Sequence, residues 1–197
     1  MNKILSIILI LSITSCSSIA FWQSDEIDPD EPRDLIDFNE RFEFTENWDT
    51  KFKGENTLNN FIPAFSGSNL FFVDPEGNVS NMDIESGEVL WEAKLETTIS
   101  AGIVAGFGKL FLSDDQGNLI SLDQEDGSIL WKSFAGGEVL ANVDVDAGLV
   151  IVKTASGFLN AFNIDTGSEE WSDRSVAPNL TVRGSSSPVI NDNTVYA

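Results

Sequence analysis

Short apolar runs separated by polar turns recur along most of the chain. Leu70–Val73 and Leu149–Val152 contain only apolar residues, and short runs of this kind are typical of strands buried on both faces. In each unit a glycine turn follows the run, then an alternating run, a second glycine turn and a run that ends in tryptophan. Another apolar-rich run precedes each unit, at 61–65, 99–104 and 139–145. Each unit therefore predicts four short antiparallel strands.

The unit repeats every 40 residues without a gap, which places Trp91, Trp131 and Trp171 at one equivalent position. Two sets of glycines keep the same spacing: Gly77, Gly117 and Gly157, then Gly87, Gly127 and Gly167. A fixed repeat of about 40 residues with four strands per unit indicates an all-β fold, the β-propeller. The predicted blades cover residues 58–94, 98–134 and 138–174, and an incomplete unit covers 186–197.

The repeated residues have structural interpretations. The glycines lie where hairpin turns require a positive φ. A tryptophan at one position per blade fills the wedge between neighbouring blades and buries on the order of 150–250 Å². The polar residues Asp83, Asp123 and Asn163 stand before the second turn of each unit, where their side chains are expected to brace the corner.

Three blades and the beginning of a fourth do not close a ring, because propellers close with about four to eight blades. We therefore interpret the chain as part of a longer propeller, with blade repeats in the range 42–197. The segment Phe42–Trp48 has the pattern of a strand that ends in tryptophan but has no preceding strands of its own. Such a segment is expected to complete the last blade of the ring.

The N-terminus is predicted to be a lipoprotein signal peptide, residues 1–15. A positive start precedes the apolar stretch Ile4–Ile13, which is too short to span a bilayer. The stretch ends in Ile-Thr-Ser-Cys, which resembles a bacterial lipobox and implies lipidation of Cys16. The alternative is an ordinary signal peptide with an incidental cysteine. Ser17 in place of Asp favours the outer membrane, and residues 16–41, rich in Asp and Glu, predict an extended acidic tether.

Composition excludes several classes of function. The net charge of −21 makes nucleic acid and anionic membrane surfaces unfavourable partners. The chain has no histidine and one cysteine, so chemistry that depends on histidine and intramolecular disulfides are excluded. Residues 114–118 and 123–127 resemble calcium loops faintly but lack alternating ligands and a distal glutamate, and hairpin turns explain them better. No catalytic, cofactor-binding or metal-binding residues are predicted.

One segment interrupts the repeat. The step from Val150 to Val195 is 45 residues, five more than between the earlier units, and the extra length lies after Trp171. Insertions in repeat proteins often form loops on the binding face. Leu180 and Val182 alternate with a polar residue and Arg183 follows, which suits contact with a protein partner. The alternative is that Leu180 and Val182 enter the first strand of the next blade.

The repeats, of the form Gly-Asn-apolar followed by Asp, Gly and Trp, resemble the propeller repeat of pyrroloquinoline-quinone proteins. With the lipobox, the acidic tether and the segment from Leu180 to Pro188, the chain resembles the BamB family, lipoproteins of the outer-membrane β-barrel assembly machinery. The resemblance implies an eight-bladed, non-enzymatic scaffold without a cofactor, lipid-anchored to the periplasmic face of the outer membrane. It implies binding of the periplasmic POTRA domains of BamA through Leu180, Val182 and Arg183, and contact with unfolded outer-membrane proteins. Val182 stands where leucine is more usual.

Two other functions remain open at this point. Quinone-dependent dehydrogenases share the repeat, although they need a carboxylate set for calcium and often a vicinal disulfide, and this chain has no cysteine pair. A lipid-anchored sensor propeller with another envelope partner is the third reading.

Overall fold

The structure is a computed structural model that describes residues 42, 44–51, 61–174 and 186–197. The chain divides into two compact units, Met1–Phe44 and Thr45–Ala197. Only Phe42 and Phe44 of the first unit are described, so the fold reported below is that of the second.

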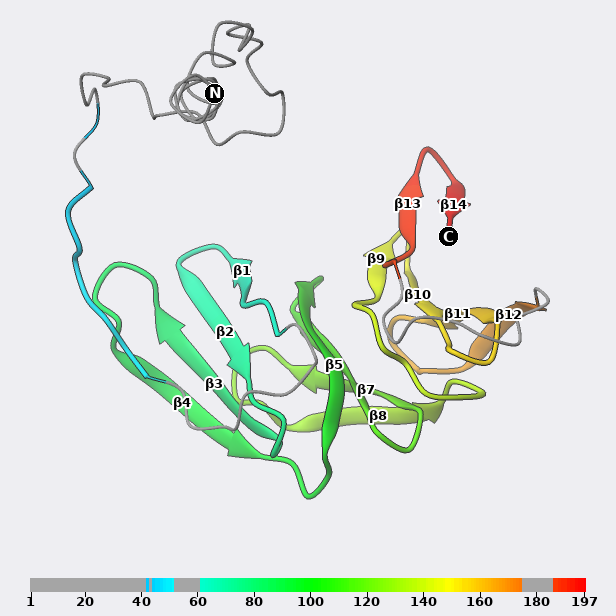
Figure 1. Cartoon of the computed structure of the whole chain (residues 1–197), viewed down its shortest axis with the longest axis horizontal. Helices are drawn as coiled ribbons and strands as arrows, with labels where there is room; N and C mark the ends of the chain where they lie inside the picture. Colours follow the sequence, from blue (N-terminus) through cyan, green and yellow to red (C-terminus); the bar gives the residue numbers. More distant parts are fainter. Residues whose placement is uncertain (1–41, 43, 52–60, 175–185) are drawn as a thin grey trace, which may run out of the picture. The chain divides into compact units, whose positions relative to one another are not determined.

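Short antiparallel strands make up the second unit, in three four-stranded sheets and one hairpin (Figure 1). The strands are β1 (Ala64–Ser66), β2 (Asn69–Val73), β3 (Asn78–Asp83), β4 (Val89–Lys94), β5 (Ile99–Gly106), β6 (Lys109–Asp114), β7 (Asn118–Asp123), β8 (Ile129–Phe134), β9 (Asp144–Asp146), β10 (Leu149–Lys153), β11 (Phe158–Asn163), β12 (Glu169–Arg174), β13 (Val189–Asn191) and β14 (Thr194–Tyr196). Strands adjacent in sequence are adjacent in each sheet, in the orders β1-β2-β3-β4, β5-β6-β7-β8, β9-β10-β11-β12 and β13-β14. Each complete sheet is one blade of a partial β-propeller, as the repeat predicts.

The outermost strand of each complete blade carries a β-bulge at the same place. In β4, Trp91 pairs with Asn81 while Val89 pairs with Met82, so Leu90 has no opposite residue. The register shifts at the equivalent points of β8 and β12, next to Trp131 and Trp171. Because a bulge locally disrupts the ladder and bends the strand, it re-aims the residue beside each tryptophan.

The hydrophobic core lies between blades. Phe71, Val73 and Val79 of the first blade pack against Leu112 and Ile120 of the second. A second cluster joins the opposite face of the second blade to the third, with Phe111 and Leu119 against Val150, Val152 and Phe162. Strands β6 and β10 are thus covered on both faces, which explains why their apolar residues follow one another without alternation.

The first strand of a blade is shorter than its predicted run in the first and third blades, where the runs are 61–65 and 139–145. β5 covers its run over eight residues, but β1 and β9 have three residues each. Val139 and Val143 are buried although they precede β9. β10 pairs with β9 only from Leu149 to Ile151, so the ladder ends there. The apolar pattern of residues 139–145 therefore reflects burial in the core and does not mark the extent of strand pairing.

Candidate functional site

Each tryptophan of the first two blades joins its blade to the next. The indole Nε1 of Trp91 donates a hydrogen bond of 3.2 Å to the carbonyl oxygen of Gln124 in the second blade. The indole of Trp131 donates one of 3.1 Å to the carbonyl oxygen of Ile164 in the third. Both acceptors lie in the turn between the last two strands of the following blade. The tryptophan thus couples neighbouring repeats through its polar end and its ring at once.

A glycine of the same turn receives each ring. A Cβ added at Gly127 would lie 2.7 Å from Cζ3 of Trp91, and one at Gly167 would lie 2.6 Å from Cδ2 of Trp131. These glycines have φ values of 73° and 69°. The position therefore requires glycine for two independent reasons, backbone conformation and room for the ring.

Trp48 occupies the corresponding place on the first blade. Its indole Nε1 donates a hydrogen bond of 3.0 Å to the carbonyl oxygen of Ile84, and a Cβ at Gly87 would lie 2.6 Å from its Cδ2. The described residues 44–51 pair with no strand of the four sheets. Residues before β1 thus supply the tryptophan that a preceding blade would supply.

Trp171 differs from the other three. It is 37% exposed, and every residue of β12 is exposed. None of the described residues accepts a hydrogen bond from its indole. Trp171 is therefore a tryptophan of the repeat whose ring has no glycine turn to meet among the described residues.

The predicted corner residues brace their turns. Oδ1 of Asp83 accepts hydrogen bonds from the backbone N–H groups of Glu85 and Ser86 and from the Ser86 hydroxyl. These bonds, the Ser86 backbone bond first, hold the pKa of Asp83 below its ordinary value. Oδ1 of Asn163 accepts in the same way from the N–H groups of Asp165 and Thr166.

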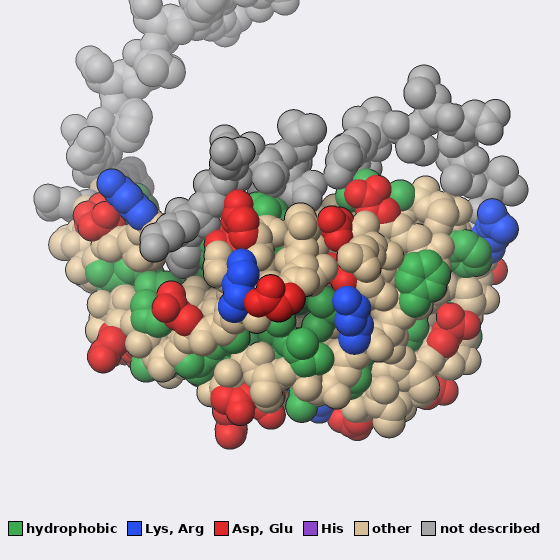
Figure 2. Space-filling view, turned by 90° about the horizontal axis from the view of Figure 1, so that it is seen from below, with side chains coloured by type: hydrophobic (Ala, Val, Ile, Leu, Met, Phe, Trp, Pro, Cys, Tyr) green, Lys and Arg blue, Asp and Glu red, His purple; other side chains and the backbone are tan. Residues whose placement is uncertain are grey.

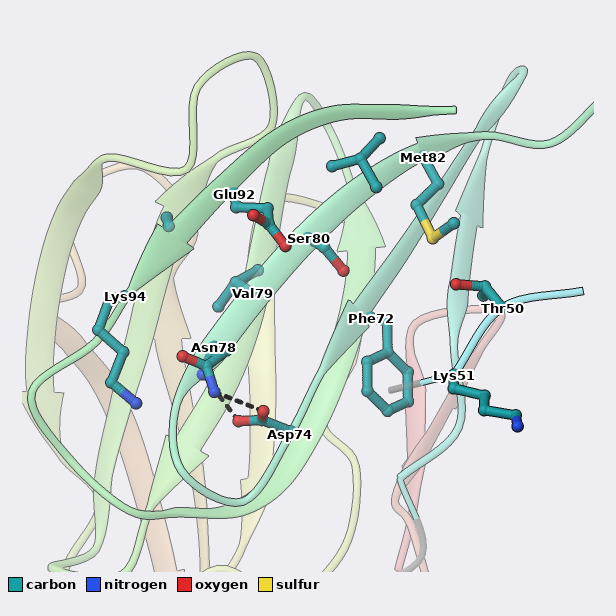
Figure 3. A pocket seen from close by; sticks show the side chains of 12 residues that line it. Thr50, Lys51, Phe72, Asp74, Asn78, Val79, Ser80, Met82, Glu92 and Lys94 are labelled. Atoms are coloured by element: carbon teal, nitrogen blue, oxygen red, sulfur yellow. Dashed lines mark hydrogen bonds between the residues drawn. The ribbon is translucent and has the colours of Figure 1, made fainter. Parts of the chain in front are cut away.

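The loop at 114–118, which resembles a calcium loop, is a hairpin turn closed from within the protein. Asp114 is buried, and its carboxylate accepts the backbone N–H of Asn118 at 2.8 Å and the Asn118 amide at 2.9 Å. Lys132 Nζ lies 2.8 Å from the other carboxylate oxygen. Asp74 and Asn78 repeat the turn in the first blade (Figure 3).

Two opposing effects act on the carboxyl of Asp114. Burial raises its pKa, but the hydrogen bonds from Lys132 and Asn118, with the charge of Lys132, outweigh burial and hold the pKa below its ordinary value. In the third blade Thr154 replaces the acid and its hydroxyl oxygen accepts the N–H of Phe158 at 3.0 Å. Among the described residues no three acidic, histidine or cysteine side chains are grouped as metal ligands.

A cavity of about 430 Å³ opens on the first blade (Figure 3). Its lining includes Phe72, Ser80 and Met82 on one face of the sheet, with Lys51 across from them. The equivalent face of the second blade, with Leu112 and Ile120, is covered by the first blade. The cavity therefore lies on the face of the first blade that, in the second blade, packs against a neighbouring blade. We interpret it as such a packing face and not as a ligand cleft.

The predicted partner residues Leu180, Val182 and Arg183 lie outside the described residues, as does Cys16. The described chain stops at Arg174, whose guanidinium lies 4.9 Å above the centre of the Phe158 ring. It resumes at 186, where Oγ of Ser186 accepts a hydrogen bond of 3.3 Å from Nζ of Lys153. In the described part of the chain, no helix has the length and apolar character needed to cross a bilayer.

The sequence predictions anticipate two features of the site only in part. The ion pair of Lys132 with Asp114 joins residues that differ between repeats, since Glu92 and Ser172 stand where Lys132 does. The Asp-x-x-x-Asn spacing of the first two repeats could have indicated the turn, but not its cation. The docking of Trp48 is signalled only by the Trp-ending pattern of its segment, because its spacing to Trp91 is 43 residues.

Comparison with known proteins identifies the family. The sequence model for outer membrane protein assembly factor BamB matches residues 75–197. Outer membrane protein assembly factor BamB of Pseudomonas aeruginosa is 33% identical over 102 residues, which are 51% of this chain and 25% of that protein. The relative from Kangiella koreensis is 32% identical over 79 residues, 39% of this chain and 20% of that protein.

Solved structures agree on the fold. The crystal structure of BamB from Moraxella catarrhalis superposes with a TM-score of 0.63 at 26% identity, covering 68% of this chain and 41% of that one. A europium-containing methanol dehydrogenase superposes with a TM-score of 0.51 at 20% identity, over 59% of this chain and 25% of that one, which shows the shared fold alone. The chain thus spans less than half the length of these relatives. Because the family model matches residues 75–197, more than half of the chain, the chain belongs to the family of outer membrane protein assembly factor BamB.

Proposed function

We propose that this chain is part of a non-enzymatic periplasmic scaffold of the outer-membrane β-barrel assembly machinery, which binds BamA and supports the insertion of outer-membrane proteins. The observation that carries the proposal is the family match over 75–197, which includes both the blade repeats and the segment at 180–183. The matched relatives are named as outer membrane protein assembly factors.

The segment proposed to contact BamA, residues 180–183, lies in the longest of the three connections between blades. Four residues separate β4 from β5, nine separate β8 from β9, and fourteen separate β12 from β13. Extra length between repeats provides binding loops, because the blades themselves keep their packing. Leu180 and Val182 would supply apolar anchors, and Arg183 would supply a fork of donors for a carboxylate of the partner.

The proposed location is the periplasmic face of the outer membrane, with the lipid on Cys16 as the anchor and residues 16–41 as the tether. More than one acyl chain gives a firm anchor where a single chain gives only marginal binding. The net charge of −21 favours a partner with basic patches and disfavours direct contact of the blades with anionic lipid.

The test is co-purification with BamA using the full-length protein. Arg183→Ala and Arg183→Glu should weaken recovery of BamA, Glu more strongly because it reverses the charge. Lys109→Ala is the matched control: its Nζ pairs with Asp165 at 2.9 Å, at the turn end of the blades. Unchanged recovery of BamA with both Arg183 variants would contradict the site, provided that circular dichroism shows intact sheets.

Titration with pyrroloquinoline quinone separates the scaffold from the quinone-dependent dehydrogenase that shares its fold. The scaffold predicts no stoichiometric binding to the full-length protein. Stoichiometric binding would favour the enzyme, and recovery of a different envelope protein in place of BamA would favour a sensor propeller.

A further inference from the structure

The outer rim of the propeller is formed by the edge strands β4, β8 and β12, which each pair with one neighbour only among the four sheets. An edge strand presents unpaired backbone N–H and C=O groups that can pair with another chain. Natural proteins commonly guard such edges with charged side chains. The three rims can be compared directly because they are equivalent strands of one repeat.

Two of the three rims carry guards. β12 has Glu169, Glu170 and Asp173 along its length, and all are exposed. β4 has the exposed charged residues Glu92 and Lys94 in its C-terminal half. Each of these strands would place charged side chains against an incoming strand.

β8 has only one charged side chain, against two on β4 and four on β12. Ile129 is 57% exposed, Leu130 43% and Phe134 62%. The strand contains no acid, and its one cation, Lys132, is 42% exposed but paired with the buried carboxylate of Asp114 at 2.8 Å. Phe134 stands where the first and third blades have Lys94 and Arg174. The second blade thus presents an apolar edge in a chain whose net charge is −21.

The exposed side chains of β8 are arranged for a strand. Ile129 pairs with Leu122 and Phe134 with Asn118 on β7, four residues apart, so both side chains project from the same face of the sheet. The bulge beside Trp131 projects Leu130 as well. Hydrophobic side chains reach the surface between acidic side chains on the side where β4 and β8 lie (Figure 2).

Two acidic side chains lie next to the N-terminal end of β8. β8 begins directly after the turn that holds Glu125 and Asp126, and both carboxylates are exposed. Hydrogen bonds from the side chain and the backbone of Ser128 keep the pKa of Asp126 below its ordinary value, so it is ionised at neutral pH. A strand antiparallel to β8 would bring its C-terminal end to these carboxylates.

We propose that the outer edge of β8 is a docking site for an extended segment of another polypeptide, which adds to the second blade as an antiparallel fifth strand. The segment carries apolar residues at alternate positions, facing Ile129 and Phe134, and Lys or Arg at its C-terminal end, facing Glu125 and Asp126. Main-chain hydrogen bonds give such an addition its affinity, and the alternate side chains give its specificity. The site is separate from the segment at 180–183 and does not depend on the proposed role of that segment.

The test uses the whole chain and a fluorescent peptide of about ten residues that alternates Val and Thr and ends in two lysines. Fluorescence anisotropy should show saturable binding, weakened about tenfold or more by Ile129→Lys or Phe134→Lys. Val89→Lys is the matched control, since Val89 is the equivalent residue of β4 and is 47% exposed. It should leave the affinity unchanged. Equal losses with Val89→Lys and Ile129→Lys would overturn the assignment to β8.

Two further peptides test the geometry. The same peptide with alternate backbone nitrogens methylated keeps its side chains but loses the donors that pair with β8, and it should not bind. Moving the two lysines to the N-terminus should weaken binding, because they would then lie near Phe134. Undiminished binding of either peptide contradicts strand addition. A dimer of the chain alone that Phe134→Lys abolishes would mean that a second copy occupies the edge, and would overturn the proposal as well.

Discussion

The indole of Trp48 packs on Gly87, where an added Cβ would lie 2.6 Å from Cδ2 of the ring. The same contact joins Trp91 to Gly127 and Trp131 to the next turn. In repeat proteins the interface between neighbouring units contributes to stability in addition to the units themselves. These contacts are therefore a place where stability can be altered one joint at a time.

Gly127→Ala should destabilise the chain by about 2–5 kcal/mol, the sum of about 1–2 for a left-handed backbone and about 1–3 for overpacking. The added methyl group would meet the Trp91 ring at 2.7 Å and Ala93 at 2.9 Å. Urea unfolding followed by tryptophan fluorescence measures the change. Gly108→Ala separates the two effects, because Gly108 has the same φ of 73° but no atom within 4 Å of the added Cβ. Equal losses at both positions would show that the ring contact contributes nothing.

Trp131→Phe should cost about 1–3 kcal/mol, because it removes the indole donor and leaves the carbonyl oxygen of Ile164 without its 3.1 Å partner. Trp171→Phe is the control within the same repeat. Its indole has no acceptor among the described residues, so the expected change is within about 0.5 kcal/mol. Denaturant midpoints of the two variants decide the matter, and a loss at Trp171 as large as at Trp131 would contradict the role given to the hydrogen bond.

The strand order and the four-stranded propeller blade could be predicted from the sequence, because the 40-residue repeat and the glycine turns agree in every unit. The glycines at 77, 117 and 157 have positive φ, as do those at 87, 127 and 167. A single period constrains all units at once, so an error in one strand cannot displace the rest. Gap-free alignment also placed Trp91 and Trp131 at equivalent joints, although nothing in the spacing indicated that their acceptors are backbone carbonyls.

The features that escaped prediction depend on contacts between residues that the repeat does not share. Lys132 reaches Asp114 across its own sheet, and no spacing rule connects position 132 with position 114. The run at 139–145 is buried but forms a strand only from Asp144, because burial sets the hydrophobic pattern while pairing depends on the neighbouring strand. The apolar edge of β8 can be recognised only when the strand order shows which strands are edges.

Asp114→Asn should destabilise the chain at neutral pH by about 1–3 kcal/mol, since the buried site then has no charge to pair with Lys132. The folded-state pKa of Asp114 is below 3.8, its value in the absence of a shift. The stabilisation is therefore fully present above about pH 4 and is lost as the pH falls through the folded pKa. The difference in unfolding free energy between the two proteins should be constant above about pH 4 and shrink steadily between about pH 4 and pH 2. A constant difference over this range would exclude the ionised carboxylate as its source.

Lys132→Met should weaken this dependence. It removes the cation that lowers the pKa of Asp114, but leaves the hydrogen bonds from Asn118, which still oppose the effect of burial. The variant should be less stable than the parent at pH 7, and the difference in unfolding free energy between the two should narrow on acidification, because the parent loses its ion pair as Asp114 is protonated. Urea unfolding at a series of pH values measures both effects. A variant that loses stability in parallel with the parent as the pH falls would contradict the ion pair.

Phe107→Gly should stabilise the chain by about 0.5–1 kcal/mol. Phe107 has a φ of 54° in the turn between β5 and β6, and its ring is 60% exposed, so the strain of a left-handed backbone is offset by little burial. Gly67 occupies the same turn position in the first blade. Phe107→Ala removes the ring but keeps the Cβ, and it should give no comparable gain. Thermal and urea unfolding distinguish the outcomes: a gain from Ala equal to that from Gly would place the cost in the exposed ring, and a loss from Gly would show that the ring makes stabilising contacts.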